Sequence, residues 1–277
     1  MSYLVIQGRE LKDGEAQTLA TLAGAARIET PGAEVLRLED PQTPDRAEDY
    51  CEGAQLDCAF VPVPRRLADI GLVAMDMDST LITIECIDEI ADLQGLKPQV
   101  AAITASAMRG EIEYTESLRR RVALLQGLSE SALQRVYDEH VKFSPGAERL
   151  IERLRSLGIR TLLVSGGFTF FTSRLKTRLG IDDMLSNTLE IKNGTLTGKV
   201  LGRIVDAQGK ATRVRELREE LKLRRDQVIA IGDGANDLAM MAEAGFSIAW
   251  RAKPVVREKA TWHFDYSGLD GLLNLYD

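Results

Sequence analysis

The sequence is poor in histidine and cysteine, and both shortages limit the sites that it can build. Two histidines in 277 residues exclude a metal site made of several imidazoles, so a metal would bind to oxygen ligands, which suit Mg²⁺. The cysteines, Cys51, Cys58 and Cys86, lack metal-type spacing and follow no secretory segment. We therefore expect reduced thiols and a cytoplasmic protein.

Long hydrophobic runs and an excess of basic residues are also missing. No apolar run approaches the roughly 20 residues of a membrane span, which predicts that the chain does not cross a membrane. The 35 basic and 42 acidic residues give a net charge of -7, which argues against a nucleic-acid-binding protein. A small anionic ligand would need a local basic site. The length allows one large domain with an insertion or two unequal domains.

Residues 1–68 alternate short extended and helical patterns in the order βαββαβ, from "YLVIQG" to "LDCAFVPV". This order predicts a small ferredoxin-like α+β domain. The segment "PVPRRLADIG" that follows contains two prolines and two arginines and is typical of a domain boundary. We predict one domain over residues 1–68 and a second over residues 69–277.

From residue 71 onwards, short apolar strands alternate with helical patterns. The stretches "GLVAMDMD", "IRTLLVSGG" and "QVIAIGDG" are each nearly continuous in hydrophobic residues before they end in small or acidic ones. Such strands predict a three-layer α/β core with a parallel sheet covered on both faces. Ligands of these sheets bind beyond the carboxyl ends of the strands, where "DMDST", "SGG" and "GDGAND" fall.

Two segments interrupt this alternation. Residues 86–141 contain helical patterns and no convincing strand, which predicts a helical cap inserted after the first acidic strand end. Asn193-Gly194 lies between alternating residues in "NTLEIKNGTLTGKVLG" and predicts a β-hairpin.

Asp76 and Asp78 directly follow the apolar run of the first strand. A D-x-D pair alone is usually a solvated turn, whereas two carboxylates beside a buried strand repel each other and resist desolvation. A cation and an electrophile bound at Asp76 would offset the repulsion between the two carboxylates. Asp78 could then act as a general acid and base.

Three further segments of the chain contain residues that could join Asp76 and Asp78 in one site. Ser165 and Gly166 in "VSGGF" offer a hydroxyl and backbone N–H groups to an anion at a strand-to-helix turn, although an ordinary tight turn explains them equally well. Asp233, Asn236 and Asp237 in "GDGAND" offer oxygen ligands that suit Mg²⁺, with a helix start capped by Asn236 or Asp237 as the alternative. Lys210 is either a surface lysine or the site's countercharge.

Taken together, these segments resemble the haloacid dehalogenase superfamily of phosphotransferases. Its four motifs occur here in order, as D-x-D-x-T at residues 76–80, a serine after the second strand, a lysine, and G-D-x-x-x-D at residues 232–237. Within it, the phosphoserine phosphatase family is the closer resemblance and covers about residues 71–275. Residues 1–68 resemble the ACT-like domain that precedes the core in some bacterial members.

The resemblance implies a role for each matching residue. Asp76 would be the nucleophile that forms an aspartyl-phosphate, and Asp78 the general acid and base. Mg²⁺ would be held by the Asp76 carboxylate, the Asp78 carbonyl and Asp233. The phosphoryl oxygens would contact Ser165, Gly166 and Lys210, while Asn236 and Asp237 would order the metal loop.

The cap would select the substrate. By the same resemblance, Glu85 would contact an ammonium group and Arg121 a carboxylate, with Arg119 and Arg120 as the alternatives on the same helix. Met108 and Tyr114 match apolar positions that close over the site, and at Tyr114 the family usually has an aromatic without a hydroxyl.

The implied activity is hydrolysis of O-phospho-L-serine, the last step of serine biosynthesis. Two alternatives stay open at this point. The first is transfer of the phosphoryl group to another alcohol, such as homoserine. The second is a non-enzymatic receiver that senses an amino acid, which the helical cap and Asp78 argue against.

Residues 1–68 could bind serine, form a homodimer or stabilise the core. The fold of this domain alone does not decide between these roles.

Overall fold

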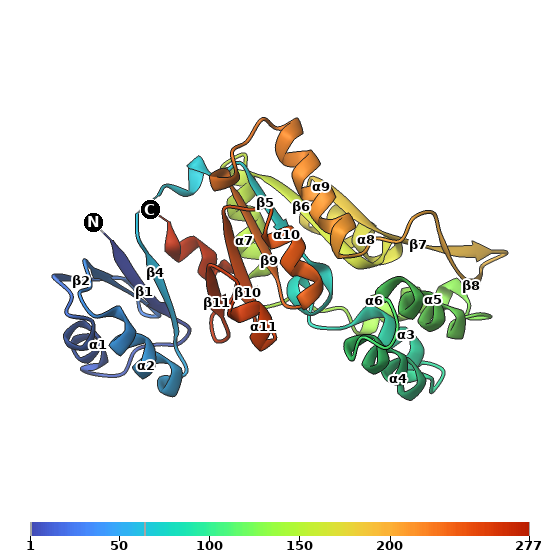
Figure 1. The fold of residues 1–277 in the computed structure, drawn as a ribbon, viewed down its shortest axis with the longest axis horizontal. Helices are drawn as coiled ribbons and strands as arrows, with labels where there is room; N and C mark the ends of the chain where they lie inside the picture. Colours follow the sequence, from blue (N-terminus) through green and yellow to red (C-terminus); the bar gives the residue numbers. More distant parts are fainter. Residues whose placement is uncertain (1, 64, 277) are drawn as a thin grey trace.

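The computed structural model describes residues 2–63 and 65–276 and arranges them around two β-sheets (Figure 1). The first sheet has the strand order β2-β3-β1-β4, and all its pairs are antiparallel. Its elements follow the chain as predicted, which confirms the ferredoxin-like arrangement. They are β1 (Tyr3–Gln7), α1 (Glu15–Ala23), β2 (Arg27–Gly32), β3 (Val35–Glu39), α2 (Pro44–Ala54) and β4 (Asp57–Val61).

The second sheet contains seven strands in the order β11-β10-β9-β5-β6-β7-β8. All neighbouring pairs are parallel except β7 and β8. The first strand of this sheet in the chain, β5, therefore lies in the middle, between β6 and β9. The strands are β5 (Leu72–Met75), β6 (Arg160–Phe168), β7 (Asp183–Lys192), β8 (Thr195–Leu201), β9 (Val228–Gly232), β10 (Phe246–Trp250) and β11 (Trp262–Phe264).

Helices cover both faces of this sheet, and β5 shows why its residues are apolar throughout. Val73 and Met75 pack in the same cluster as α7 and α8, whereas Leu72 and Ala74 pack with α9, α10 and α11. Successive side chains of a strand point to opposite faces, so a strand covered on both sides needs an unbroken apolar run. The expected three-layer core is confirmed. Its helices are α7 (Ala147–Ser156), α8 (Thr169–Leu179), α9 (Ala207–Glu220), α10 (Leu238–Met241) and α11 (Pro254–Arg257).

The cap consists of four helices between β5 and α7 (Figure 1). The β7–β8 hairpin is bonded to it, because the Gly127 N–H donates to the Leu196 carbonyl at 2.9 Å and the Leu196 N–H donates to the Leu128 carbonyl at 2.8 Å. Asn193 and Gly194 both have positive φ, 52° and 71°, as the predicted tight turn requires. The cap helices are α3 (Cys86–Asp92), α4 (Lys97–Met108), α5 (Tyr114–Leu124) and α6 (Glu130–Glu139).

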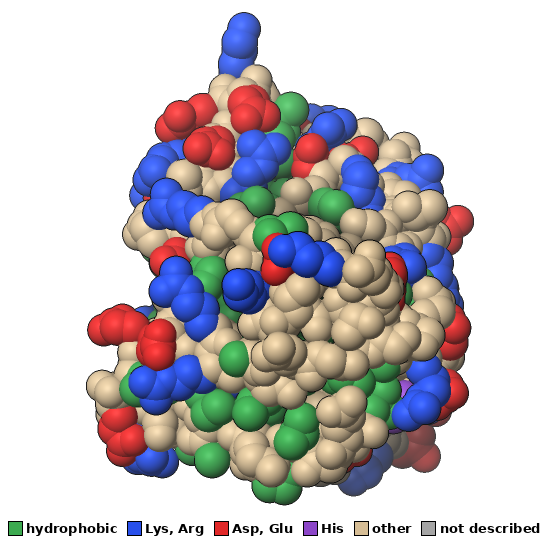
Figure 2. Space-filling view, turned by 90° about the vertical axis from the view of Figure 1, so that its right-hand side faces the viewer, with side chains coloured by type: hydrophobic (Ala, Val, Ile, Leu, Met, Phe, Trp, Pro, Cys, Tyr) green, Lys and Arg blue, Asp and Glu red, His purple; other side chains and the backbone are tan. Residues whose placement is uncertain are grey.

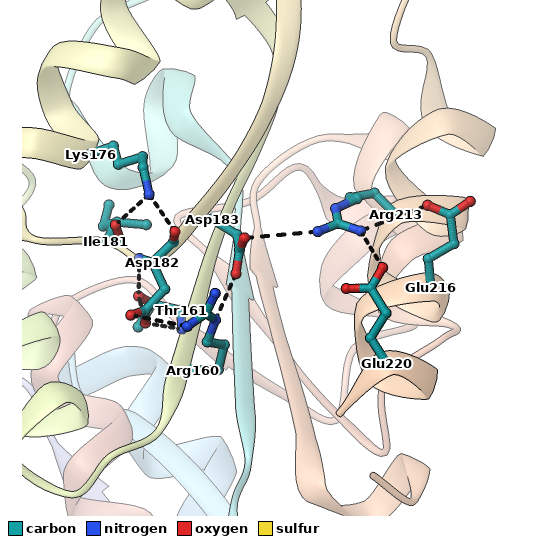
Figure 3. Close-up of polar contacts among 9 residues, drawn as sticks. All are labelled: Arg160, Thr161, Lys176, Ile181, Asp182, Asp183, Arg213, Glu216 and Glu220. Carbon is teal, nitrogen blue, oxygen red and sulfur yellow. Dashed lines mark hydrogen bonds and ion pairs between the residues drawn. The ribbon is translucent and has the colours of Figure 1, made fainter. Parts of the chain in front are cut away.

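A polar network ties the helices to the amino ends of β6 and β7 (Figure 3). The Asp182 carboxylate accepts hydrogen bonds from the N–H and the hydroxyl of Thr161 at 2.9 and 2.8 Å. Lys176 of α8 donates to the Ile181 and Asp182 carbonyls. Arg213 of α9 lies 3.0 Å from Glu220 and 3.9 Å from Asp183. These charges lie at strand starts, so they support the scaffold at the end of the sheet opposite to the carboxyl-terminal turns.

The amino-terminal sheet is attached to the end of the chain through a buried carboxylate. Asp57 accepts hydrogen bonds from the backbone N–H groups of Asp265 at 2.7 Å and Ser267 at 2.8 Å, and from the Ser267 hydroxyl at 2.6 Å. Arg37 donates to the carbonyls of Asn274 and Tyr276 at 3.0 and 2.8 Å.

The predicted boundary at residue 68 stays a prediction. In the described ranges, the helices are too short or too polar to cross a membrane.

Candidate active site

The turns that follow β5, β6 and β9 come together at one edge of the parallel sheet (Figure 1). The strands are direct neighbours in the order β9-β5-β6, and each runs in the same direction. Residues separated by about 150 positions in the sequence therefore meet, and the Thr80 hydroxyl donates to the Asp233 carboxylate at 3.2 Å. The expected convergence of the three acidic or small turns is what the structure shows.

Asp76 is the first residue after β5, and its side chain is almost completely buried, with 5% of the residue exposed. Its carboxylate accepts a hydrogen bond from the Met77 N–H at 2.7 Å. The carboxylate of Asp78 accepts from the Cys86 N–H at 2.9 Å. The two carboxylates are thus held by different backbone groups, one in the turn after β5 and one at the start of α3 (Cys86–Asp92).

Lys210 neutralises part of this charge. Its Nζ lies 2.8 Å from Oδ1 of Asp76 and 2.8 Å from Oδ1 of Asp237, and all three residues are buried. The lysine belongs to the first turn of α9, which is capped by Asp206 accepting from the Gly209 N–H at 2.7 Å. Lys210 is therefore part of the site and is not a surface charge.

Asp76, Asp233 and Asp237 form a cluster that could hold a metal ion. One carboxylate oxygen from each lies within 4.8 Å of the others. Both oxygens of Asp237 already accept a hydrogen bond, Oδ1 from Lys210 and Oδ2 from the Gly234 N–H at 3.1 Å. The contacts of Asp76 and Asp233 fall on Oδ1, so Oδ2 of each is the more available oxygen. The carboxylate of Asp78 lies outside the cluster, and Asn236 packs its Oδ1 against Gly234.

Burial raises the pKa of the carboxyl groups of Asp76 and Asp233 at this edge. Burial and the charge of Asp237 raise the pKa of Asp76 well above its ordinary value, although Lys210 opposes the shift. The same two causes raise the pKa of Asp233 to about 6. Burial alone would lower the pKa of Lys210, but the carboxylates of Asp237 and Asp76 raise it. A site with more buried carboxylates than cations favours binding of a further positive ion.

Asp78 and Glu85 are affected in the same direction. Burial raises the pKa of Asp78, partly opposed by the hydrogen bond from the Cys86 N–H. Burial and the charge of Asp78 raise the pKa of Glu85 to about 7. The Ser79 hydroxyl donates to the Glu85 carboxylate at 2.8 Å and so fixes the position of that side chain beside the turn after β5. A carboxyl that keeps its proton near neutral pH can act as an acid.

Small residues at the carboxyl end of β6 make room for Asp78 and Tyr114. A Cβ at Gly167 would lie 2.6 Å from Oδ2 of Asp78, and a Cβ at Gly166 would lie 2.3 Å from the Tyr114 hydroxyl oxygen. Ser165 is buried, and its hydroxyl accepts from the Gly167 N–H at 2.8 Å. The glycines allow Asp78 from the turn after β5 and Tyr114 from α5 to approach this backbone closely.

Asn187 is a functional residue that sequence analysis missed. This buried residue of β7 donates from Nδ2 to the Gly166 carbonyl at 2.7 Å, and its Oδ1 accepts from the Val205 N–H at 2.8 Å. It thus holds the Gly166–Gly167 peptide and joins this end of β6 to the segment before α9. The only signal in the sequence is an asparagine inside a half-buried strand.

The cap contributes Tyr114 and Arg121 from one face of α5, seven residues apart. Nε of Arg121 is buried and has no hydrogen-bond partner among the described residues. Its neighbours on the helix differ, because Arg119 is exposed and Arg120 pairs with Glu116 at 2.7 Å on the surface. Of the three candidate arginines, Arg121 alone is partly buried with unused hydrogen-bonding capacity.

Met108 is not brought into this group. It ends α4, and 67% of it is exposed. Figure 2 views the molecule from the cap side and shows hydrophobic side chains gathered in its lower part, over the cap helices. The predicted apolar contact of Met108 with the site therefore stays a prediction.

A family model described as haloacid dehalogenase-like hydrolase matches residues 73–242, which include every turn of the site. The chain belongs to this hydrolase family. A second model, a domain of unknown function (DUF4072), matches residues 4–49.

Relatives of this hydrolase include a curated phosphoserine phosphatase from Albidiferax ferrireducens, 53% identical over 78% of this chain and 93% of the relative. A HAD-family hydrolase from Salmonella enterica serovar Typhi has the same fold over 100% of this chain and 99% of its own, with 34% identity and a TM-score of 0.90. A phospho-aspartyl intermediate analogue of a phosphoserine phosphatase is 35% identical, with a TM-score of 0.70, over 75% of this chain and 99% of its own.

Lys210→Met tests whether the lysine compensates the buried carboxylates. Without its charge, Asp76 and Asp237 face each other unpaired, and breaking a buried pair costs about 3–5 kcal/mol. The raised pKa of Asp76 should rise further, because Lys210 lowers it. Because protonation removes the repulsion, we expect the loss in free energy of unfolding to be larger at pH 8 than at pH 5, as measured by urea denaturation without metal. Lys259→Met, on an exposed residue, serves as the control. A pH-independent loss would contradict the assignment.

Proposed function

We propose that this hydrolase is a Mg²⁺-dependent phosphatase that converts O-phospho-L-serine to L-serine and phosphate through an aspartyl-phosphate. The observation that carries the proposal is the buried Asp76 carboxylate at the end of β5, 2.8 Å from the Lys210 ammonium, with Asp78 on the same turn. The names of the curated relative and of the phospho-aspartyl analogue support the substrate and the intermediate.

In the first step, a carboxylate oxygen of Asp76 attacks phosphorus, and the bond from phosphorus to the serine oxygen breaks. Asp78 donates its proton to the departing oxygen, and its raised pKa keeps that proton available. In the second step, Asp78 removes a proton from the water that attacks the aspartyl-phosphate, which releases phosphate and restores Asp76. Splitting the displacement in this way is nucleophilic catalysis.

The phosphoryl oxygens would be bound by the Ser165 hydroxyl, the Gly166 N–H and Lys210. Asn187 donates to the Gly166 carbonyl and so fixes the Gly166–Gly167 peptide that follows this N–H. Mg²⁺ would be held by Asp76, Asp233 and the Asp78 carbonyl, and when bound it supplies positive charge against the phosphoryl oxygens. Asn236 and Asp237 would hold the metal loop in shape.

The serine part of the substrate would bind between Glu85 and Arg121. Glu85 offers a carboxylate for the ammonium group. The buried, unpartnered Nε of Arg121 suits a carboxylate, because a guanidinium can grip one with two parallel hydrogen bonds. Tyr114 and Met108 would close over the bound substrate.

We also propose a wider setting for this activity. The last step of serine biosynthesis follows from the proposed substrate. A cytoplasmic location is consistent with three cysteines that are all free. Serine binding or homodimer formation through residues 1–68 remains a prediction.

Arg121→Ala tests the substrate assignment. Removing charge-assisted hydrogen bonds worth about 1.5–3 kcal/mol should raise KM for phosphoserine tenfold or more. Phosphoethanolamine lacks the carboxylate, so its kinetics should change little. The measurement is steady-state phosphate release in the presence of Mg²⁺.

Arg120→Ala is the matched control, because it removes the neighbouring, surface-paired arginine from the same helix. Equal effects of Arg121→Ala on both substrates would show that Arg121 does not read the carboxylate. Failure of the unmodified protein to prefer phosphoserine over phosphoethanolamine would contradict the proposed substrate.

Metal binding gives a prediction that does not depend on turnover. Mg²⁺ binds only the folded site, so adding MgCl₂ should raise the Tm of the unmodified protein. Asp233→Asn should abolish most of this increase, because it removes a carboxylate from the cluster. Asp138→Asn, on the exposed face of α6, should retain it. An equal increase in both variants would refute the proposed ligand set.

A further inference from the structure

The hydroxyl of Tyr114 lies against the backbone of the turn that would bind phosphate. Of the heavy atoms around a Cβ built on Gly166, Oη of Tyr114 is the nearest at 2.3 Å, followed by Cζ of the same ring at 3.4 Å. Tyr114 begins α5 in the cap, whereas Gly166 belongs to β6 of the core. The side chain therefore crosses from the cap to the core at this point.

This hydroxyl has no hydrogen bond with any residue that the structure describes, although it lies in a polar and crowded place. The Gly166 carbonyl beside it already accepts from Asn187. Four charged side chains lie near enough to affect the pKa of Tyr114, namely Lys210, Arg121, Asp76 and Asp78. A phenol that served only as an apolar cover would not need its oxygen at this position, where a phenylalanine ring would leave space for the Gly166 backbone.

The hydroxyl is a donor at neutral pH. Burial raises the pKa of Tyr114 above its ordinary value, and the positive charges of Lys210 and Arg121 do not reverse that shift. A neutral phenol has one O–H to donate. The groups proposed to bind the phosphoryl oxygens, Ser165, the Gly166 N–H and Lys210, are donors too, so a phosphoryl group at Gly166 would present an acceptor to Tyr114.

We infer that the Tyr114 hydroxyl donates a hydrogen bond to a phosphoryl oxygen bound at Gly166, so that this cap residue contacts the reacting group and not only the apolar surface of the substrate. The inference rests on the proposed function for its substrate. It applies equally to inorganic phosphate, which offers the same oxygens. Tyr114 then differs from Arg121, whose proposed contact is with the serine carboxylate.

Tyr114→Phe is the central test, because it removes one oxygen and keeps the ring. We expect the Kd of inorganic phosphate for the Mg²⁺-loaded protein, measured by calorimetry, to rise about tenfold, which is the loss of one hydrogen bond to a charged acceptor. The kcat/KM values for phosphoserine and for p-nitrophenyl phosphate should fall by a similar factor. Inhibition by L-serine should not change.

Tyr137→Phe on α6 is the matched control, since it removes a hydroxyl from another cap helix and should leave phosphate binding unchanged. Unaltered phosphate affinity in Tyr114→Phe would overturn the inference. A loss of activity confined to phosphoserine would place the hydroxyl on the serine part and would also overturn it. Because phosphate binding needs no turnover, an unmodified protein that ignored phosphoserine would refute the proposed function and leave this test valid.

Gly166→Ala checks the geometry on which the inference depends. The added methyl group would collide with the Tyr114 hydroxyl, so it should lower the Tm more in the unmodified protein than in the Tyr114→Phe background. Equal losses in both backgrounds would show that the hydroxyl does not occupy that position.

Discussion

The ammonium group of Lys210, held 2.8 Å from both Asp76 and Asp237, is the contact on which the site depends. Three charges are buried together at the end of a parallel sheet, and one positive group faces two negative ones. Buried charges are stable only when they are paired and hydrogen-bonded. The remaining negative charge, together with Asp233, favours the binding of a further cation at this cluster.

The fold supplies this arrangement through the order of its strands. Because β5 lies between β6 and β9, three turns far apart in the sequence share one edge of the sheet. The glycines at 166 and 167 allow side chains of the cap and of the first turn to approach the second turn closely. The cap brings Tyr114 and Arg121 over the same edge, while the ion pairs around Arg160 and Asp183 hold the opposite end.

Much of this could be predicted from the sequence, because it is encoded locally. The apolar run of β5, the Asn193-Gly194 turn and the helical patterns of residues 86–141 each specify local elements. The parallel direction of the strands puts Asp76, Ser165 and Asp233 at one edge of the sheet, where the order β9-β5-β6 makes them neighbours. Pairings between distant, unremarkable residues could not be predicted. Asn187 bonds to Gly166 and Val205, and Asp57 bonds to Ser267, only after the sheets have assembled. The exposure of Met108 likewise depends on how the cap sits, which no local pattern encodes.

The most direct measurement is acid quenching of the protein during turnover of phosphoserine with Mg²⁺, followed by mass spectrometry of the peptide that contains Asp76. The account predicts one phosphoryl group on Asp76, and none in Asp76→Asn, which should also release phosphate at least a thousandfold more slowly, since loss of an attacking group typically costs several powers of ten. Phosphate release without a phosphorylated Asp76, or near-normal turnover by Asp76→Asn, would contradict it.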